Sequence, residues 1–483
     1  TAPTDIYTLS QHDALPICRR GRNFNNIILN HKVLKLLSDI LYKTDLLQIS
    51  GSTDRMIESI IYDSRLVKSG SLFVAIKGNT SDGHDYIQKA IDAGATAIVY
   101  QQNIEDFQSN VTYIKVADSS FALGVIASNF YGNPSNFLKL VGVTGTNGKT
   151  TIATLLYKLF RNKGFKCGLI STVVNQIDDV SIAAAYTTPD AVELNRLLSE
   201  MVAAGCTYCF MEVSSHAIDQ ERIAGVKFAG GLFTNITHDH LDYHKTFSNY
   251  LNAKRTFFDR LDRNSFAITN IDDKNGWIMV QNTAAKRYTY GIKNMADFKG
   301  SILEDQKSGL VMQIEGKEVW CKLVGEFNAY NLMAIYACAC QLGMDREDAL
   351  TALSGLEAVE GRFDYVTGKN KITGIVDYAH TPDALENVIK TINNLRKANE
   401  RLITVVGCGG NRDAAKRPLM ASIAAAMSDK VVITSDNPRF ENADDIIDDM
   451  KRGLSPVAEK KVLVVQNRRE AIKIAVSVAG AGD

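Results

Sequence analysis

Short apolar runs alternate with helical patterns through most of the chain. The runs 137–143, 209–213, 231–235 and 265–269 contain few polar residues, which is typical of strands buried on both faces of a parallel sheet. The segment 152–160 follows the first run and has its apolar residues at helical spacing. Polar loops follow the runs, so the pattern predicts a central α/β domain that binds ligands at the carboxyl edge of its sheet.

The same alternation predicts a smaller domain on each side. Strands 70–78 and 95–100 flank a helix near the N-terminus. Towards the C-terminus, strands alternate with helical runs and predict a second doubly wound α/β domain. Its expected strands are 372–377, 402–406, 431–434 and 462–465. The predicted fold is therefore α/β with three domains, which we place at 25–118, 119–359 and 360–483.

Residues 1–24 stand apart from this organisation. They lack the basic segment followed by an apolar segment that a signal peptide needs. They resemble translated cloning adaptor, so we expect them to lie outside the fold.

Composition narrows the possible partners. The 54 basic and 54 acidic residues balance, so no bulk charge attracts nucleic acid or a membrane surface. No apolar run approaches the length of a membrane span. The pair Cys206 and Cys209 has CxxC spacing, which leaves a redox or zinc pair as an alternative. Because this pair enters an apolar strand and no second CxxC exists, we predict buried, reduced thiols.

The segment 145–150, GTNGKT, lies between the predicted strand 137–143 and the predicted helix 152–160. Glycines before a helix let backbone N–H groups approach phosphates, and the helix N-terminus adds partial positive charge. Lys149 is positioned to reach the β- and γ-phosphates, and the Thr150 hydroxyl to ligate Mg²⁺. The predicted ATP-binding loop consists of Gly145, Thr146, Asn147, Gly148, Lys149, Thr150 and Thr151.

Two further segments supply candidate metal ligands. Glu212 ends a predicted strand, where a carboxylate can ligate the Mg²⁺ that bridges nucleotide phosphates. His238, His240 and His244 fall within seven residues, a density that also fits zinc. No cysteine lies nearby, and a phosphate site favours Mg²⁺. We therefore interpret His238 and His244 as loop residues or supporting residues.

The short phosphate loop and the segment 234–244, TNITHDHLDYH, resemble the Mur ligases, which join amino acids to the UDP-muramyl peptide of bacterial cell-wall synthesis. The resemblance covers about 27–483, with the motifs in family order. It implies a cytoplasmic, monomeric enzyme that uses ATP and Mg²⁺ and forms an acyl-phosphate intermediate. The family continues beyond the last residue here with a strand and a GKGHE-like loop, so we expect the chain to be truncated.

The resemblance also assigns roles to residues of the central domain. It implies catalytic roles for Lys149, Glu212, His240 and Lys254, the last carbamylated to N6-carboxylysine as a ligand of Mg²⁺. It places Asn328 and Asn331 near the adenine, Arg362 near the phosphates and Asp377 near the ribose. It assigns the UDP-muramyl dipeptide, UDP-N-acetylmuramoyl-L-alanyl-D-glutamate, to Ser64, Thr187, Thr188, Ser215, Gln220 and Arg222.

The segment 436–439, DNPR, concerns the third substrate, which is the amino acid that the ligase joins to the UDP-muramyl dipeptide. In the family, these four residues accompany meso-2,6-diaminopimelate, whose second carboxylate Arg439 can bind with two hydrogen bonds. Arg412, in the nearby GGNRD segment, is expected to help. The residues assigned to diaminopimelate are Arg412, Asp436, Asn437, Pro438 and Arg439. A lysine-adding ligase, a folylpolyglutamate synthetase and a GTPase switch remain alternatives, although the NKxD segment of a GTPase is missing.

Overall fold

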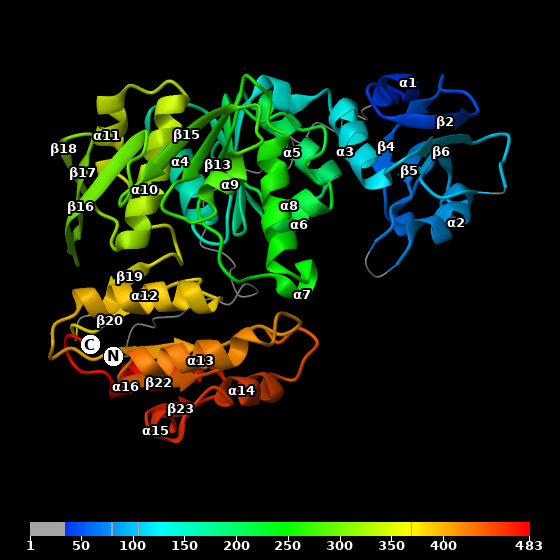
Figure 1. Ribbon diagram of the computed structural model, residues 1–483. Coiled ribbons are helices and arrows are strands. Elements are labelled where there is room, and N and C mark those ends of the chain that lie inside the picture. Colours follow the sequence, from blue (N-terminus) through cyan, green and yellow to red (C-terminus); the bar gives the residue numbers. More distant parts are fainter. Residues whose placement is uncertain (1–33, 79–80, 105, 369) are drawn as a thin grey trace, which may run out of the picture. The chain divides into compact units, whose positions relative to one another are not determined.

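The structure, a computed structural model, describes residues 34–78, 81–104, 106–368 and 370–483. The adaptor-like residues 1–24 lie outside the described residues. Contacts divide the chain into one compact unit at Val33–Arg362 and a second that contains Phe363–Asp483. The first unit holds both the predicted N-terminal domain and the predicted central domain (Figure 1).

A sheet of eleven strands forms the frame of the first unit. Seven adjacent strands in its middle are parallel, and four of them lie close to the apolar runs 137–143, 209–213, 231–235 and 265–269. In spatial order they are β9 (Cys167–Ile170), β12 (Tyr208–Glu212), β8 (Lys139–Thr144), β13 (Gly230–Phe233), β14 (Phe266–Asn270), β15 (Lys286–Gly291) and β16 (Phe298–Gln306). Antiparallel strands extend both sides: β10 (Val174–Ile177), β11 (Val180–Ala183), β17 (Gly309–Ile314) and β18 (Lys317–Cys321).

Helices cover both faces of this sheet. Successive residues of a strand point to opposite faces, so Leu140 and Val141 of β8 enter two different cores. The core that contains Val141 is covered by α4 (Lys149–Asn162), α10 (Glu326–Gln341) and α11 (Arg346–Ser354). The core that contains Leu140 is covered by α5 (Ala191–Ala203), α8 (Phe247–Asp259) and α9 (Gly276–Val280). Burial on both faces explains why β8, β12, β13 and β14 have few polar residues.

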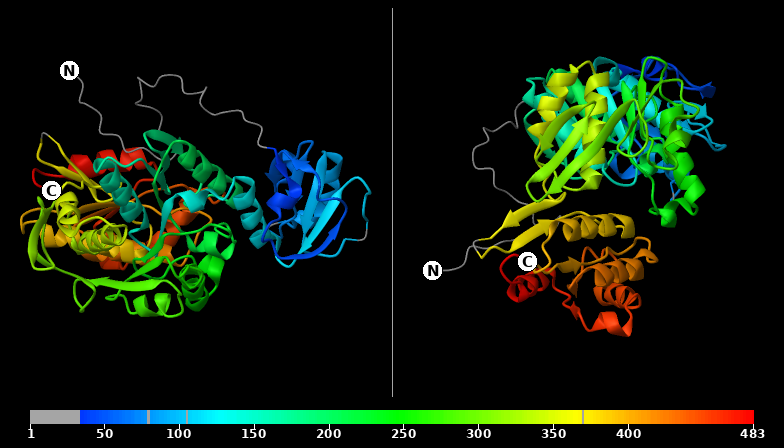
Figure 2. Two further views of the ribbon diagram at one scale, coloured as in Figure 1. Left: turned by 90° about the horizontal axis from the view of Figure 1, so that it is seen from above. Right: turned by 60° about the vertical axis from the view of Figure 1, so that its left-hand side comes forward.

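A second, smaller sheet stands at the N-terminal side of the first unit. Its order is β2 (Leu46–Ser50), β7 (Thr112–Val116), β6 (Ala95–Tyr100), β5 (Ser71–Val74) and β4 (Ser59–Ile61), all parallel except β2. The helix α2 (Ile87–Asp92) precedes β6, as predicted. The helix α3 (Ser119–Phe130) contacts both α1 (Leu37–Ile40) and α5, and so joins the small sheet to the large one (Figures 1 and 2). The short strands β1 (Lys35–Leu36) and β3 (Met56–Ile57) pair separately.

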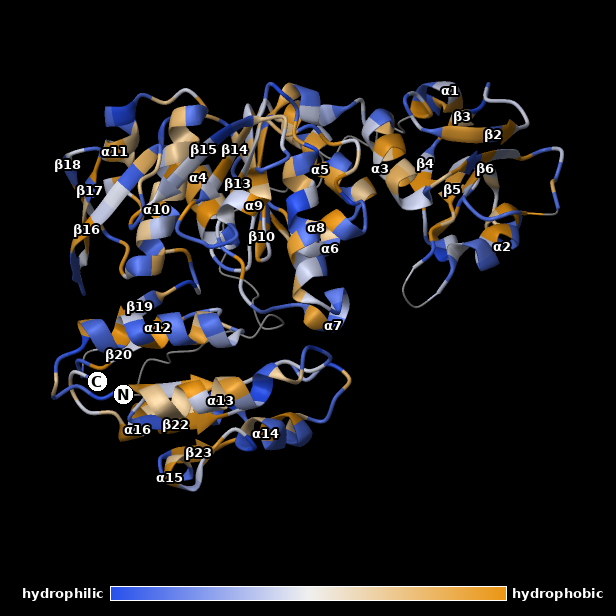
Figure 3. Ribbon diagram, in the orientation of Figure 1, coloured by the Kyte–Doolittle hydropathy of each residue, from blue (hydrophilic) through white to orange (hydrophobic). Residues whose placement is uncertain are grey.

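The C-terminal unit contains a parallel sheet of three strands, β21 (Ile403–Val406), β22 (Lys430–Ile433) and β23 (Val462–Val464). The accompanying helices are α12 (Pro382–Leu395), α13 (Lys416–Met427), α14 (Ala443–Lys451), α15 (Pro456–Glu459) and α16 (Arg468–Val478). β22 and the residues of α13 that share its core are coloured hydrophobic in Figure 3.

One strand of the C-terminal prediction is wrong. The run 372–377 was expected to join the doubly wound sheet. Instead, β20 (Thr373–Val376) pairs only with β19 (Asp364–Thr367), as an antiparallel ribbon. Most of β20 is exposed, so its short apolar run is not the signature of a strand buried on both faces.

Candidate active site

The phosphate loop lies between β8 and α4, and its two glycines have backbone conformations that favour glycine. Gly145 has φ 147° and Gly148 has φ 87°. A Cβ atom built on Gly145 would lie 1.9 Å from the Thr234 hydroxyl oxygen, and one on Gly148 would lie 2.6 Å from Asn331 Oδ1. No side chain caps the N-terminus of α4, so its first N–H groups face the loop. Glycine loop and uncapped helix start together fit a phosphate group.

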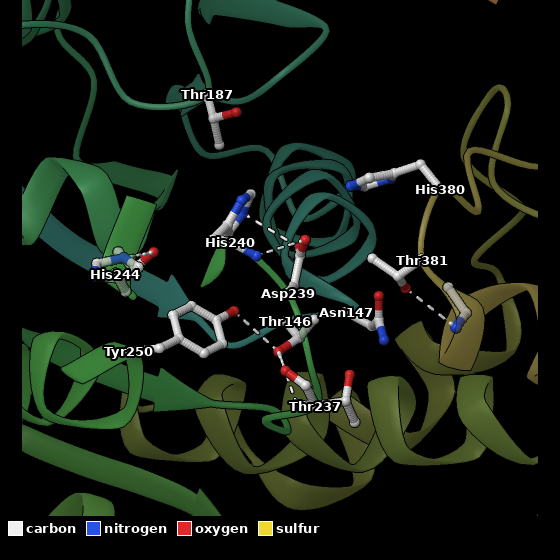
Figure 4. Close-up of polar contacts among 12 residues, drawn as sticks. Thr146, Asn147, Thr187, Thr237, Asp239, His240, His244, Tyr250, His380 and Thr381 are labelled. Atoms are coloured by element: carbon white, nitrogen blue, oxygen red, sulfur yellow. Dashed lines mark hydrogen bonds and ion pairs between the residues drawn. The ribbon is translucent and has the colours of Figure 1, made fainter. Parts of the chain in front are cut away.

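The end of β13 fixes the shape of this loop. The Thr146 N–H donates to the Asn235 carbonyl at 2.8 Å, and the Asn147 N–H donates to Asn235 Oδ1 at 3.0 Å. The Thr234 hydroxyl donates to the Asn147 carbonyl at 2.6 Å. The Tyr250 hydroxyl lies 3.0 Å from the Thr146 hydroxyl (Figure 4). Sequence reasoning assigned no role to Asn235 or Tyr250, although Asn235 is the second residue of the histidine-rich segment 234–244.

Lys149, the first residue of α4, curls back over the phosphate loop. Its Nζ donates to the Gly145 carbonyl at 3.0 Å and to the Thr146 carbonyl at 2.8 Å. Desolvation lowers the pKa of Lys149, and the nearby carboxylates of Glu212 and Asp239 oppose that shift. An ammonium group in this place is available to a phosphate that displaces the carbonyls.

Lys254, on α8, points to the same loop. Its side chain is buried, and its Nζ donates to the Gly145 carbonyl at 2.8 Å. Burial lowers the pKa of Lys254 well below its ordinary value, and the positive charge of Lys149 adds to the shift. Burial therefore favours the neutral amine, which is the form that reacts with CO₂ in carbamylation.

Two carboxylates and one imidazole complete this group of charges. Glu212 is buried at the end of β12 and accepts from the Thr172 N–H at 2.7 Å. Asp239, also buried, accepts from the His240 N–H at 2.9 Å, and its other oxygen lies 3.3 Å from His240 Nε2 (Figure 4). Burial lowers the pKa of His240 to about 3, although Asp239 opposes the shift, so the imidazole stays neutral. Sequence reasoning missed Asp239; its only signal was a carboxylate between two candidate histidines.

The predicted Mg²⁺ ligands fit a divalent cation. Hydroxyl and carboxylate oxygens, here from Thr150 and Glu212, are the donors that Mg²⁺ prefers. The neutral imidazole of His240 can bind a metal, and carbamylation would convert Lys254 into an anionic oxygen donor. Among the described residues, no group of three histidine, cysteine or acidic side chains could hold a metal.

Three residues assigned to the UDP-muramyl peptide form one hydrogen-bonded set beside Glu212. The Thr188 hydroxyl donates to the Glu212 carbonyl at 2.8 Å. Arg222 Nη1 donates to the Thr188 carbonyl at 2.9 Å, while its Nε and Nη2 donate to Gln220 Oε1 at 3.0 and 2.6 Å. The structure thus places Thr188, Gln220 and Arg222 next to the end of β12.

Thr187 and Ser215 border the same strand end. The Thr172 hydroxyl donates to the Thr187 hydroxyl at 3.1 Å and also contacts the Glu212 carboxylate. Ser215 begins α6 (Ser215–Asp219), and its hydroxyl lies 3.0 Å from His244 Nε2. His244 therefore contacts an assigned residue, whereas His238 is exposed.

Ser64 lies on the small sheet's side of the first unit. It begins a short 3₁₀ helix that Asp63 caps by accepting from the Arg65 N–H at 3.0 Å. Tyr62 lies two residues before Ser64, and its hydroxyl hydrogen-bonds to the Asp190 carboxylate. Burial raises the pKa of Tyr62, and the negative charge of Asp190 raises it further. Asp190 caps α5 directly after the TTP segment, so the segment of Ser64 approaches the segment of Thr187.

The residues assigned to ATP are distributed over both units. Asn331 Nδ2 donates to Asn328 Oδ1 at 3.0 Å on α10, and Arg362 Nη2 donates to the Thr150 hydroxyl at 2.9 Å. These three therefore adjoin the phosphate loop. Asp377 belongs to the C-terminal unit, where its carboxylate accepts from the Phe363 N–H at 2.7 Å and the Ala379 N–H at 2.8 Å.

The residues assigned to diaminopimelate lie after β21 and β22 of the C-terminal unit. The Asn437 N–H donates to Asp436 Oδ1 at 2.8 Å, and the Arg439 N–H donates to Asn437 Oδ1 at 3.1 Å. The Arg439 guanidinium donates to the Gly410 carbonyl at 2.7 Å, which brings it beside the segment of Arg412. Both arginines are exposed to solvent. Pro438 packs closely on Gly410: a Cβ built there would lie 1.9 Å from the Pro438 carbonyl oxygen.

The CxxC pair is not a site. Cys206 and Cys209 are buried free thiols, as predicted, and burial raises the pKa of both. No helix among the described residues has the length and apolar character to cross a membrane.

Comparison with known proteins identifies the class. Three family models match: "Mur ligase family, catalytic domain" over 56–131, "Mur ligase middle domain" over 143–339 and "Mur ligase, glutamate ligase domain" over 361–483. The chain belongs to the Mur ligase family. That assignment removes the GTPase alternative, because the phosphate loop lies within a chain whose matched domains are all those of Mur ligases.

Within the family, the similarity points to one kind of ligase. The chain is 56% identical, over 92% of both sequences, to the UDP-N-acetylmuramoyl-L-alanyl-D-glutamate--2,6-diaminopimelate ligase of Cytophaga hutchinsonii. A solved structure of a ligase with the same name has a TM-score of 0.66 at 29% identity, covering 93% of this chain and 92% of that one. A folylpolyglutamate synthase of Mycobacterium tuberculosis has a TM-score of 0.61 at 16% identity, covering 74% and 88%, and shares the fold alone.

Proposed function

We propose that the protein is an ATP- and Mg²⁺-dependent ligase that adds meso-2,6-diaminopimelate to UDP-N-acetylmuramoyl-L-alanyl-D-glutamate in peptidoglycan synthesis. The observation that carries this proposal is the 56% identity, over 92% of the chain, to a ligase named for these two substrates. The DNPR segment supports it, because Arg439 offers a planar guanidinium that matches the extra carboxylate of diaminopimelate.

The reaction has two steps. The D-glutamyl carboxylate attacks the γ-phosphorus of ATP, ADP leaves, and an acyl-phosphate forms. The amine of diaminopimelate then attacks the acyl carbon, loses a proton and expels inorganic phosphate. Lys149 is placed to neutralise the charge that moves between the carboxylate and the γ-phosphate, and the N–H groups of the loop hold the phosphates in place.

The central site would hold Mg²⁺ through Thr150, Glu212, His240 and the carbamate of Lys254. The bound ion supplies positive charge to the phosphate oxygens. The chain's own contribution is to keep these donors buried and fixed before substrate binds. Burial favours the neutral amine of Lys254, and hydrogen bonds from Thr172 hold the Glu212 carboxylate.

The dipeptide substrate would lie along the side chains that gather at the end of β12. Arg222 suits its phosphate or carboxylate oxygens, because the guanidinium already presents several donors beside Thr188. Asn328 and Asn331 would hold the adenine of the nucleotide. A cytoplasmic, monomeric enzyme fits this proposal, and light scattering of the purified protein tests the oligomeric state.

Phosphate release tests the proposal directly. With ATP, Mg²⁺ and the UDP-muramyl dipeptide present, release should depend on added diaminopimelate and should be much slower with lysine. Mass spectrometry should identify the UDP-muramyl tripeptide. A preference for lysine would change the third substrate, and absence of a product with either amino acid would refute the proposed function.

A further inference from the structure

Two loops of the C-terminal unit are joined by several hydrogen bonds. The first loop, 408–413, follows β21, and the second, 435–442, follows β22. The Gly410 N–H donates to the Asn437 carbonyl at 2.9 Å, and the Phe440 N–H donates to Asn411 Oδ1 at 2.9 Å. Since Arg412 and Arg439 stand on different loops, the spacing of their guanidinium groups depends on how the loops are joined.

Both loops hold a residue in an unfavourable backbone conformation. Asn411 has φ 50° and Arg439 has φ 52°, which is the left-handed region. Side chains other than glycine rarely adopt this region, and they persist there when surrounding contacts hold them. Asn411 directly precedes Arg412, and Arg439 is itself assigned to the third substrate.

Arg417 is the buried anchor behind these loops. It lies in the first turn of α13 with 2% of its surface exposed. Its Nη2 donates to both carboxylate oxygens of Glu441 at 2.9 and 2.8 Å, and its Nη1 donates to Asp449 on α14 at 2.9 Å. Glu441 also accepts a hydrogen bond from the backbone N–H of Asn411. Glu441 thus joins the second loop to the first loop and to α13.

We propose that Arg417 and Glu441 are positioning residues that fix the distance between Arg412 and Arg439, and so set the selectivity for a substrate with two carboxylates over one with a single carboxylate. This inference rests on the proposed function. Neither Arg417 nor Glu441 needs to touch the substrate. They act through the Asn411 backbone, which carries Arg412, and through the loop that carries Arg439.

The ion pair of Arg417 and Glu441 contributes more to the orientation of the loops than to the stability of the fold. A buried ion pair gains little net free energy, because desolvation of both charges offsets their attraction. Among the described side chains, Arg417 Nε is buried without any hydrogen-bond partner, which adds to that cost. The planar guanidinium, however, binds Glu441 through Nη2 and Asp449 through Nη1, so it holds the Glu441 carboxylate in place.

Glu441→Gln and Asp449→Asn form a matched pair for the test. Each removes one charged partner of Arg417, but only Glu441 contacts the first loop. Steady-state rates would be measured with diaminopimelate and with lysine, at saturating ATP and UDP-muramyl dipeptide. Thermal unfolding of both variants would be measured in parallel.

We expect Glu441→Gln to raise the KM for diaminopimelate about tenfold and to reduce the preference over lysine by a similar factor, with the KM for ATP unchanged. Asp449→Asn should lower the melting temperature comparably and leave the preference unchanged. Arg417→Lys, which keeps the charge but loses the planar guanidinium, should change the preference in the same direction as Glu441→Gln.

Two results would overturn the inference alone. Unchanged selectivity in Glu441→Gln would show that the pair does not position the guanidinium groups. An equal loss of selectivity in Asp449→Asn would reduce the role of Arg417 to folding. A wild-type protein that uses lysine and ignores diaminopimelate would overturn both this inference and the proposed function, which distinguishes the two failures.

Discussion

The phosphate-loop region and the pair of loops assigned to diaminopimelate differ in how far their charged groups are exposed to solvent. Around the phosphate loop, Glu212 and Lys254 are each 1% exposed and bonded to protein groups. In the C-terminal unit, Arg412 and Arg439 are exposed. Charges act most strongly where water is excluded, and weakly where solvent surrounds them. Under the proposed function, group transfer would depend on the buried region, whereas recognition of the third substrate would depend on exposed groups that water screens.

The backbone of the two regions differs in the same way. The phosphate loop uses glycines, and Gly145 could not be replaced without a collision with Thr234. The diaminopimelate loops place Asn411 and Arg439, with full side chains, in the left-handed region and hold them by contacts. We therefore expect small changes in those contacts to alter recognition gradually, and replacement of Gly145 to disturb the phosphate loop itself.

The largest effect should come from Lys149→Ala. We expect loss of ATP-dependent ligation by about 10³-fold or more, because the variant removes a positive charge from the transferring phosphoryl group. The melting temperature should change little, since Lys149 bonds only to loop carbonyls. Lys163→Ala removes an exposed ion pair with Asp348 near the other end of α4 and serves as the control. Retention of a tenth of wild-type activity in Lys149→Ala would contradict the assigned role.

Lys254→Ala should follow, with ligation reduced by about 10²- to 10³-fold, because the variant removes the anionic ligand that carbamylation provides. Acetate should restore part of the activity by occupying the vacated space, whereas chloride at equal ionic strength should not. Lys254→Arg, which cannot be carbamylated, should resist rescue. A crystal structure with ATP and Mg²⁺ that shows an unmodified amine at Lys254 would refute the idea.

Arg439→Ala tests the exposed region and should have a graded effect. Losing hydrogen bonds to a charged group costs about 1.5–3 kcal/mol, which raises the KM for diaminopimelate by about one to two decades. The KM for ATP should stay the same. Arg468→Ala, which removes another exposed arginine 3.9 Å from Asp436, should change neither value much. An unchanged KM for diaminopimelate in Arg439→Ala would exclude this residue from the substrate site.

Much of the buried region follows from the sequence, because its physical constraints are local. Strands buried on both faces must be apolar, which is why β8, β12, β13 and β14 lie close to the predicted runs. A glycine loop before a helix indicates phosphate wherever it occurs. The roles of Asn235 and Asp239 depend instead on which strand neighbours β8, and pairing between distant strands leaves no local pattern.

The exposed region was harder to predict for the same reason. DNPR as a sequence is a turn, and only the resemblance connected it with a substrate. Glu441, just after DNPR, accepts a hydrogen bond from the backbone of Asn411, about thirty positions earlier. It is also bound by the buried Arg417, which the sequence alone places on an ordinary helix. The misplaced strand at 372–377 has a similar origin, since a half-exposed ribbon and an interior strand share the same short apolar run.

The smallest expected effect is on stability and concerns His240. Its pKa is about 3 in the folded protein and about 6.5 in an unfolded chain, because burial disfavours the imidazolium. Between these values the unfolded state binds more protons, so stability falls as the pH drops from about 6.5 towards 3 and is unaffected above that range. The side chain is 28% exposed, so we expect a loss of only about 1–2 kcal/mol between pH 7.5 and 4.5.

Urea unfolding of the ligand-free protein at several pH values, with constant ionic strength, measures this loss. His240→Gln should make the free energy of unfolding less dependent on pH in this range, because glutamine does not titrate. His238→Gln, at an exposed position two residues away, is the matched control. Equal slopes in wild type and His240→Gln would mean that the imidazole is hydrated in solution. His240 would then titrate near its ordinary pKa, and the phosphate-loop region would not exclude water at this residue as the comparison with the exposed loops requires.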